Sequence, residues 1–315
     1  MDFIFSTGSL WSYGIERCFE LAARTGFDGI ELMVDQRWDT RQPDHLRRLS
    51  DQHHLPIVAV HSPFTPSVPG WPFDEPGRIQ ATVKLAQALS ARVVVHHLPI
   101  RVGWIWIQVG QKSLPLPVPG WDRGKPYCRW LECDYAALQE SVGLILCIEN
   151  MPTKQILGRR WQLHHWNTPE EIVRFPSLTM DTTHLGTWGL EPVDVYPRLN
   201  GQVCHIHLSN FDGKEHRRPE AGRLHLDRFL ALLARDSYRG VISLEMQPDA
   251  LDAGQSDDHL VELMTASLAL CRVWASTPEI GIPVPVGWHP YASLQGVRNG
   301  RDNSLSRCIG RPCAA

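Results

Sequence analysis

Histidine and carboxylate side chains recur in this sequence where short apolar runs end. A carboxylate at the end of such a run is costly to bury without a cationic partner, and few Lys or Arg residues stand nearby. Imidazole and carboxylate together, without thiolate, suit Zn²⁺, Mn²⁺, Fe²⁺ or Co²⁺. The pattern therefore predicts a metal site. The residues concerned are His61, His96, His97, Glu149, Asp181, His205, His207 and Glu245, with His184 and His216 shortly after two of these runs.

Each of these residues also has an ordinary structural interpretation. A single histidine at a strand end is more often satisfied by the core or a loop, and a single glutamate pairs with Arg or Lys about as often as with a metal. That interpretation would have to hold independently at six successive strand ends. The metal site is therefore the preferred interpretation.

The elements that would position these side chains alternate between strand and helix along the chain. Eight such alternations favour parallel strands joined by right-handed crossovers, and a single (β/α)8 barrel fits the count best. An open doubly wound sheet is the second choice, weakened because no GxGxxG follows the first strand. The expected strands are 3–6, 29–34, 57–61, 92–97, 145–149, 178–181, 203–208 and 241–245. The expected helices are 12–25, 43–53, 76–90, 133–142, 168–174, 192–199, 224–236 and 257–275.

Two regions do not follow this alternation. Residues 98–131 form a Pro-, Gly- and Trp-rich insertion after the fourth strand, and residues 277–315 form an irregular Pro/Gly-rich tail behind a barrel of residues 1–276. The insertion is predicted to cover the carboxyl ends of the strands, where the loops of such a barrel carry its chemistry. Its segment WIWIQV alternates like a strand, which suggests a hairpin. Trp104 and Trp106 are assigned to substrate binding on this basis.

The same strand ends also carry a family resemblance. They resemble the xylose-isomerase-like TIM-barrel superfamily, which contains sugar phosphate isomerases and epimerases and also endonuclease IV, of AP endonuclease family 2. The resemblance spans roughly residues 1–275 and is specific to the superfamily rather than to one activity. The motifs are VHSPF (60–64), VVVHH (93–97), CIENMP (147–152), MDTTHLG (180–186), HIHLSN (205–210), EHRRPEAG (215–222) and SLEMQP (243–248).

The resemblance implies roles for individual residues. The metal ligands shared by the superfamily match Glu149, Asp181, His207 and Glu245, and in the epimerases the two glutamates also act as acid and base. The further zinc ligands of endonuclease IV match His61, His96, His184 and His216. An aspartate expected two residues before His216 is replaced by Lys214, so a third ion is not favoured. One to three divalent ions are expected, Zn²⁺ first, with Mn²⁺, Mg²⁺, Fe²⁺ and Co²⁺ left open. His97 and Arg217 are assigned to the substrate.

Three functions stay open at this stage. Clustered ions bridged by a carboxylate would activate water for hydrolysis of a phosphoester, and this function uses all the histidines. A single ion with two flanking glutamates would instead serve a sugar or sugar-phosphate isomerase or epimerase. A barrel that binds a metal or a sugar without catalysis is the third. The preference is for hydrolysis of a sugar-phosphate or nucleotide-containing substrate, with Glu149 and Glu245 as the catalytic residues.

The composition and charge of the chain limit the kinds of molecule that it is expected to bind. Lys and Arg number 31 against 34 Asp and Glu, a formal charge of −3, so DNA is not favoured and a small sugar- or phosphate-containing substrate is. The sequence contains no run of 18 apolar residues, so no membrane span is predicted. The N-terminus enters a predicted strand without a signal segment. The cysteines form no CxxC pair and are interpreted as reduced thiols. A cytoplasmic protein is expected, and a homo-oligomer is left open.

Overall fold

The computed structural model describes residues 1–276, except 66, 110–111, 119–120, 157 and 200. Its chain forms two compact units. Among the described residues, the first holds 1–98, 144–162 and 166–276, and the second holds 99–143 and 163–165. The tail expected at 277–315 lies outside the described residues.

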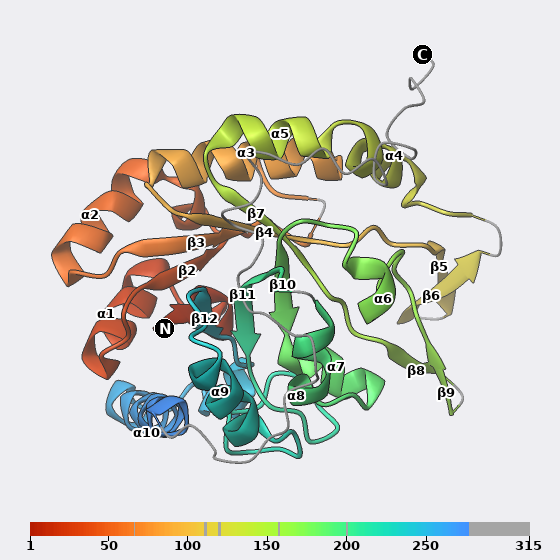
Figure 1. Ribbon diagram of the computed structural model, residues 1–315. Helices are drawn as coiled ribbons and strands as arrows, with labels where there is room; N and C mark the ends of the chain where they lie inside the picture. The colour runs from red at the N-terminus through yellow and green to blue at the C-terminus, as the bar shows by residue number, and fades with distance from the viewer. Residues whose placement is uncertain (66, 110–111, 119–120, 157, 200, 277–315) are drawn as a thin grey trace, which may run out of the picture. The chain divides into compact units, whose positions relative to one another are not determined.

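The first unit is a closed barrel of eight parallel strands (Figure 1), in the order β1-β12-β11-β10-β7-β4-β3-β2. The predicted (β/α)8 barrel is therefore confirmed, and the doubly wound sheet is excluded. Every predicted barrel strand is present within a residue or two of its expected bounds. The strands are β1 (Asp2–Ser6), β2 (Ile30–Met33), β3 (Ile57–His61), β4 (Val93–His97), β7 (Ile145–Glu149), β10 (Leu178–Asp181), β11 (Val203–Leu208) and β12 (Val241–Leu244).

Helices surround the barrel, and their ends follow local sequence signals. Gly26 ends α1 in the left-handed region at φ 87°, and Thr168 with Glu171 forms a capping box on α6. In Figure 1, α10 lies beside α1 and α9. The helices of this unit are α1 (Ile15–Thr25), α2 (Pro43–His53), α3 (Glu75–Ala88), α6 (Pro169–Ile172), α7 (Thr182–Trp188), α8 (Pro192–Val195), α9 (Leu226–Arg235) and α10 (Asp257–Ser276).

Strand alternation decides which side chains face the interior of the barrel. Buried residues of non-neighbouring strands form one cluster: Ile4, Val58, Ala59, Val93, Val95, Cys147 and Val241. Strands that are not neighbours can touch only across the barrel interior, so most of these positions mark the inward face. Because side chains alternate with period two, the next inward positions towards the carboxyl ends are His61, His97 and Glu149. The ladder also pairs His97 with Glu149 and Asp181 with His207, so the two residues of each pair lie side by side on neighbouring strands.

The second unit is not the structureless loop that its composition suggested. The strands β5 (Gly103–Val109) and β6 (Lys112–Val118) pair antiparallel, as the alternation in WIWIQV predicted. Helices α4 (Lys125–Cys133) and α5 (Tyr135–Val142) follow. The sequence prediction lacks α4 because this helix begins inside the Pro- and Gly-rich stretch, although a proline in the first turn is compatible with a helix start. The side chains of Trp104 and Trp106 lie outside the described part of the structure, so their assignment to substrate binding stays a prediction.

One further element was not predicted from the sequence. The hairpin β8 (Lys154–Ile156) with β9 (Arg159–Trp161) was not predicted, because each strand has only three residues. Cys18, Cys128, Cys147, Cys204 and Cys271 are free thiols. These five thiols agree with the prediction of reduced cysteines. None of the described helices has both the length and the apolar character needed to cross a bilayer.

Candidate metal centre

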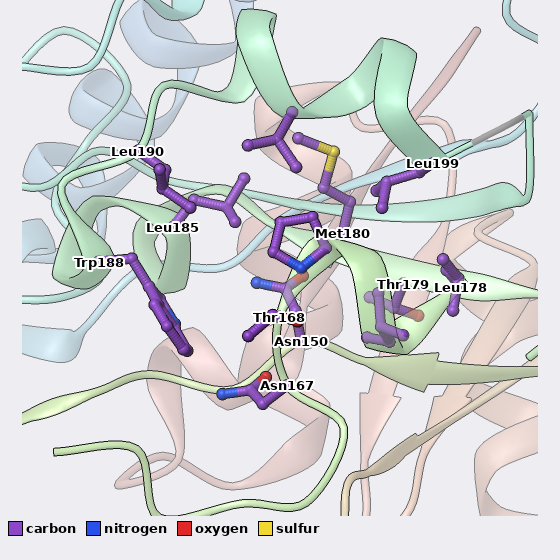
Figure 2. A pocket seen from close by; sticks show the side chains of 13 residues that line it. Asn150, Asn167, Thr168, Leu178, Thr179, Met180, Leu185, Trp188, Leu190 and Leu199 are labelled. Atoms are coloured by element: carbon purple, nitrogen blue, oxygen red, sulfur yellow. The ribbon is translucent and has the colours of Figure 1, made fainter. Parts of the chain in front are cut away.

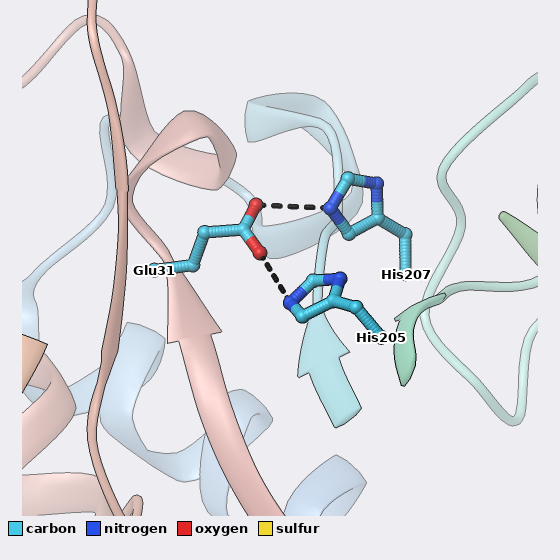
Figure 3. A group of neighbouring side chains, drawn as sticks. All are labelled: Glu31, His205 and His207. Atoms are coloured by element: carbon cyan, nitrogen blue, oxygen red, sulfur yellow. Dashed lines mark ion pairs between the residues drawn. The ribbon is translucent and has the colours of Figure 1, made fainter. Parts of the chain in front are cut away.

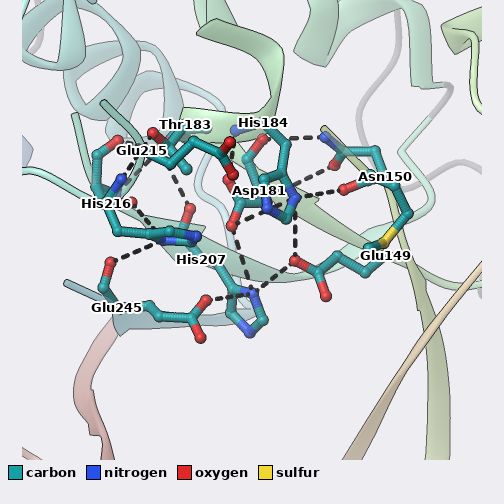
Figure 4. A network of polar contacts seen from close by, with 12 residues as sticks. Glu149, Asn150, Asp181, Thr183, His184, His207, Glu215, His216 and Glu245 are labelled. Carbon is teal, nitrogen blue, oxygen red and sulfur yellow. Dashed lines mark hydrogen bonds and ion pairs between the residues drawn. The ribbon is translucent and has the colours of Figure 1, made fainter. Parts of the chain in front are cut away.

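Four side chains from four strand ends converge in the barrel interior (Figure 4). One ligand atom from each of Glu149, Asp181, His207 and Glu245 lies within 4.8 Å of all the others. Nδ1 of His207 is 3.0 Å from Glu149 Oε1, 3.0 Å from Glu245 Oε2 and 3.7 Å from Asp181 Oδ2. The structure thus brings together all four residues expected to share one ion.

Local hydrogen bonds fix Asp181 through one carboxylate oxygen and leave the other without a hydrogen bond. Its Oδ1 accepts the backbone N–H of His184 at 2.7 Å and so caps α7. Its backbone is fixed by Asn150, whose Oδ1 accepts the Asp181 N–H at 2.8 Å and whose amide donates to the Asp181 carbonyl at 3.1 Å. The remaining Oδ2 is buried and receives no hydrogen bond. This orphaned oxygen is available to a cation.

Within the described residues, histidine is the only ionic partner of these carboxylates. Burial disfavours the charged form of Glu149, yet His207 and the hydrogen bonds from His61 and His97 hold its pKa well below the usual range. Burial likewise opposes ionisation of Glu245, but His207 lowers the pKa of Glu245 to about 2. In the described part of the chain no Lys or Arg forms an ion pair with Glu149, Asp181 or Glu245. The donor set therefore fits a divalent cation.

Two further imidazoles, those of His61 and His97, contact Oε2 of Glu149, whereas His207 contacts Oε1. Nε2 of His61 and Nε2 of His97 each lie 3.3 Å from Glu149 Oε2, and the two rings are 4.9 Å apart. Nδ1 of His61 is 2.7 Å from the Ser62 carbonyl. Because a carbonyl only accepts, Nδ1 must carry a proton, so Nε2 of a neutral His61 turns its lone pair towards the carboxylate.

The contact beside His61 at Glu149 is made by His97, the neighbour of His96 on β4. The expected role of His96 beside His61 stays a prediction, because successive side chains on β4 point to opposite faces. His97 shares the inward face with Val95 and makes the contact instead. His96 is fully buried, and desolvation with the neighbouring His97 lowers its pKa to about 3. It is therefore held neutral at neutral pH.

A third group is less complete. His184 and His216 approach Asp181 closely enough to share an ion with it, and their rings lie 5.4 Å apart. Nδ1 of His184 donates to the Asn150 carbonyl at 2.7 Å. Lys214 supplies no anion here, and the neighbouring Glu215 pairs with Lys154 at 3.2 Å. The geometry gives this group only one carboxylate, which the four-residue cluster already uses.

A cleft of about 790 Å³ opens above these clusters. Its charged side chains are paired among themselves, Arg37 with Asp35 and Lys154 with Glu215. Trp11 and Phe64 line it while 59% and 61% exposed. Arg217, expected at the substrate, is not among the lining residues and pairs with Asp249 at 2.6 Å. The lining residues are Gly8, Trp11, Met33, Asp35, Gln36, Arg37, His61, Phe64, Thr65, His97, Glu149, Met151, Pro152, Lys154, His184, Glu215, His216, Glu245, Met246 and Gln247.

A second cavity, behind β10, is much smaller (Figure 2). It has a volume of about 10 Å³ and is lined mostly by apolar side chains, among them Met180, Leu185 and Trp188. Such a space holds about one water molecule at most. It is a packing gap beside Asn150 rather than a substrate site.

Some residues of the site region were missed from the sequence. Glu31 on β2 is fully buried and contacts both His205 and His207. The signal was present in the segment GIELM, where a carboxylate interrupts a buried strand and so requires a partner. Trp11 and Phe64 were missed as cleft residues because an aromatic residue in a loop also packs against helices.

The loop that carries His216 depends on the buried Asn210. Its amide donates to the carbonyls of Pro219 and Leu224, and its oxygen accepts the N–H groups of Phe211 and Leu224. Replacing it with alanine removes the partner of the Pro219 carbonyl and of the Phe211 and Leu224 N–H groups, whereas the Leu224 carbonyl keeps the N–H of Leu226. We expect N210A to lower the free energy of unfolding by about 2–4 kcal/mol, measured by urea denaturation. The exposed Gln255→Ala is the control, and a loss below about 0.5 kcal/mol would contradict this role.

Comparisons with known proteins agree with this architecture. Residues 19–264 match the family model described as a xylose isomerase-like TIM barrel. An uncharacterised protein of Mycobacterium leprae is 24% identical over 292 residues, covering 85% of this chain and 96% of that one. One of Mycobacterium tuberculosis is 26% identical over 281 residues, covering 82% and 93%.

Solved structures with similar folds include proteins of two kinds. A D-psicose 3-epimerase, solved in the presence of D-fructose, has a TM-score of 0.61 at 17% identity and covers 88% of this chain and 100% of its own. A D-tagatose 3-epimerase-like protein has a TM-score of 0.56 at 21% identity, covering 87% and 99%. A family 2 AP endonuclease from Brucella melitensis has a TM-score of 0.58 at 17% identity, covering 82% and 97%. At these identities the similarity shows the fold alone.

Proposed function

From the premise that this chain belongs to the xylose isomerase-like TIM-barrel family, we propose that it is a divalent-metal-dependent hydrolase. Its substrate is a phosphoester in a small molecule that contains a sugar phosphate or a nucleotide. Two ions share Glu149, one held also by Asp181, His207 and Glu245 and the other by His61 and His97. This assignment replaces His96 with His97 and leaves the third group out.

The observation that carries the proposal is the pair of imidazoles on Glu149 Oε2. Both nitrogen–oxygen distances are 3.3 Å, beyond the usual range of a charged hydrogen bond. Two ligand atoms on one Zn²⁺ lie about 3.4 Å apart at tetrahedral angles, given bonds of about 2.1 Å. A lone pair on His61 Nε2 facing a carboxylate is repulsive, so this contact requires a proton or a metal ion between the two atoms. A second ion would take the place of the proton at this point.

Individual residues would then have separate roles in the hydrolysis. A pair of ions on a shared carboxylate lowers the pKa of bound water and neutralises the oxygens of an in-line displacement. Glu149 holds the two halves of the centre at a fixed separation. Glu245 reaches the cleft with 13% of its side chain exposed and is the group that accepts the proton of the attacking water. The Arg37 and Lys154 side chains, already paired, contribute little net charge.

The charge of the cleft links the number of ions to the kind of substrate. Its lining holds four carboxylates, Asp35, Glu149, Glu215 and Glu245, against the two cations Arg37 and Lys154. With the ligand Asp181 these are five carboxylates against two cations, so one divalent ion would leave a net charge of about −1 and two would leave about +1, which attracts a phosphate. The two-ion centre and the phosphoester substrate therefore support each other.

A second candidate function is epimerisation or isomerisation of a sugar. The observation that favours it is the pairing of Arg37 with Asp35 and Lys154 with Glu215, which suits an uncharged polyol when a single ion is bound. Glu149 and Glu245 would then exchange a proton with carbon at either side of the substrate. In that case His61 is a cation that pairs with Glu149, which agrees with the raised pKa of His61 despite its burial.

Metal counting separates the two candidates. We expect two divalent ions per chain by elemental analysis after loading with Zn²⁺, and one in His61→Ala. The wild-type protein should hydrolyse bis(p-nitrophenyl) phosphate, and His61→Ala should lose this activity about 100-fold or more. One ion per chain in both proteins, with turnover of a ketose, would establish the epimerase instead. Absence of turnover on both substrate classes would leave a non-catalytic metal-binding barrel.

A further inference from the structure

A buried carboxylate below the metal centre faces two histidines of the same strand (Figure 3). Glu31 on β2 is 0% exposed, and so are His205 and His207 on β11. Glu31 Oε2 lies 2.8 Å from His205 Nε2, and Oε1 lies 3.0 Å from His207 Nε2. Neither of the roles above uses Glu31 or His205. A buried carboxylate kept without a function in binding or packing would be destabilising.

The distances place a proton on Nε2 of His207. Glu31 lies 3.0 Å from this nitrogen and 2.8 Å from Nε2 of His205, and two facing lone pairs at such distances would repel. Nδ1 of His207 lies equally close to Glu149 and Glu245, 3.0 Å from each, so it also carries a proton when no cation is present. A metal ion held by the four-residue centre would take the place of the proton on Nδ1, and Glu31 would keep the other proton on Nε2.

We propose that Glu31 is a positioning residue that sets the tautomer and orientation of His207 for metal binding. This inference rests on the four-residue metal centre of the proposed function, but not on the reaction that the centre catalyses. A metal-ligating histidine generally presents its other N–H to a carboxylate or carbonyl, and loss of that partner weakens metal binding. Glu31 is the carboxylate that faces Nε2 of His207 in this way.

His205 completes the arrangement by fixing Glu31 itself. Its Nε2 engages the second oxygen of the carboxylate, so Glu31 cannot rotate without breaking one of the two contacts. The rings of His205 and His207 pack edge to face, 5.0 Å apart at 88°. The sequence pattern His-x-His on β11 and Glu in β2 thus joins two strands that are not neighbours in the barrel.

The first test needs no variant. In ¹⁵N NMR of the Zn²⁺-loaded protein, with selectively labelled histidine, we expect the His207 ring to carry its single proton on Nε2 and His205 to do the same. A His207 ring protonated only on Nδ1 would overturn the inference, because Glu31 would then face a lone pair.

The second test measures Zn²⁺ affinity by competition with a chromophoric chelator. Glu31→Gln keeps the size of the side chain but can accept a proton from only one imidazole at its single oxygen, and we expect about 10–100-fold weaker binding at unchanged stoichiometry. His205→Asn should cause a smaller loss, and the exposed Glu20→Gln is the control. If Glu31 acts through His207, then E31Q added to His207→Asn should cause no further loss.

Three outcomes would overturn the inference: a change below threefold in E31Q, an equal loss in the His207→Asn background, or the loss of one whole ion. The result is independent of the proposed function. Weakened metal binding in E31Q without phosphoester hydrolysis by the wild type would reject the hydrolase alone. Hydrolysis together with unchanged metal affinity in E31Q would reject the positioning role alone.

Discussion

Glutamine in place of Glu149 is expected to abolish turnover, with a loss of at least about 10³-fold in kcat/KM. Glu149 receives histidines on both oxygens, His207 at Oε1 and His61 and His97 at Oε2. A neutral amide offers one oxygen instead of two and removes the charge that both halves of the centre share. Asp181 and His207 are the other residues of the described site that belong to more than one of these clusters.

Elemental analysis and steady-state kinetics check this prediction together. We expect fewer than one Zn²⁺ per chain in Glu149→Gln after dialysis against a weak chelator. The matched control is Glu191→Gln, whose carboxylate pairs with His225 near the start of α9, and it should retain both ions and full activity. Two tightly held ions in the Glu149→Gln protein would contradict the shared-carboxylate arrangement.

The second large effect concerns the pH dependence of stability in the metal-free protein. Burial opposes the charged form of His61, His184 and His207, but their carboxylate partners raise each pKa above 6.5. A raised histidine pKa adds stability that is fully present below the unfolded value of 6.5 and is lost as pH rises through the folded value. The metal-free protein should therefore lose stability as pH rises above 6.5.

Other groups reverse this trend on the acid side. Burial lowers the pKa of His96 and His205, so they stay neutral in the fold and destabilise it as pH falls below 6.5. Glu149 and Glu245 have lowered pKa values, and the stability they contribute above pH 4.5 is lost on further acidification. Stability of the metal-free protein should thus be greatest near pH 6.5.

Thermal unfolding with and without Zn²⁺ tests both statements. Between pH 6.5 and 9 the Tm of the metal-free protein should fall by on the order of 5 °C. The increase in Tm on adding Zn²⁺ should grow over the same interval, because the ligands bind metal in their deprotonated forms. A metal-free Tm that rises steadily to pH 9 would show that the histidines are not held as cations by these carboxylates.

The barrel could be predicted from sequence because each strand has its own signal. Short β-branched runs such as IVAVH and ILCIE are bounded by turns and separated by amphipathic stretches, and both features are local. The polar residue at the end of each run marks its carboxyl terminus. The four-residue cluster followed from these strand ends together with the family resemblance.

The choice between His96 and His97 could not be made from β4 alone. VVVHH is apolar on both faces, as strands of a parallel barrel are, so the period of two that reveals the inward face is absent. The side of each histidine is set by the register with β3 and β7, which is a long-range property. The partners of Glu31 could not be identified for a related reason, since they lie on β11, far away in the sequence.

The ligand that the two proposed sites share also determines the order in which this protein would bind and release metal ions. The four-residue cluster is complete without its neighbour, whereas His61 and His97 depend on an oxygen of Glu149 that belongs to the same carboxylate. A second dication bound about 3.5–4 Å from the first is repelled by it. In the proposed two-ion centre the ions would therefore leave in a fixed order, the one at His61 first. Free metal concentration would then select between two forms of the same chain, and purification with a chelator would yield the singly loaded one. An assay at a single zinc concentration would report on only one of them.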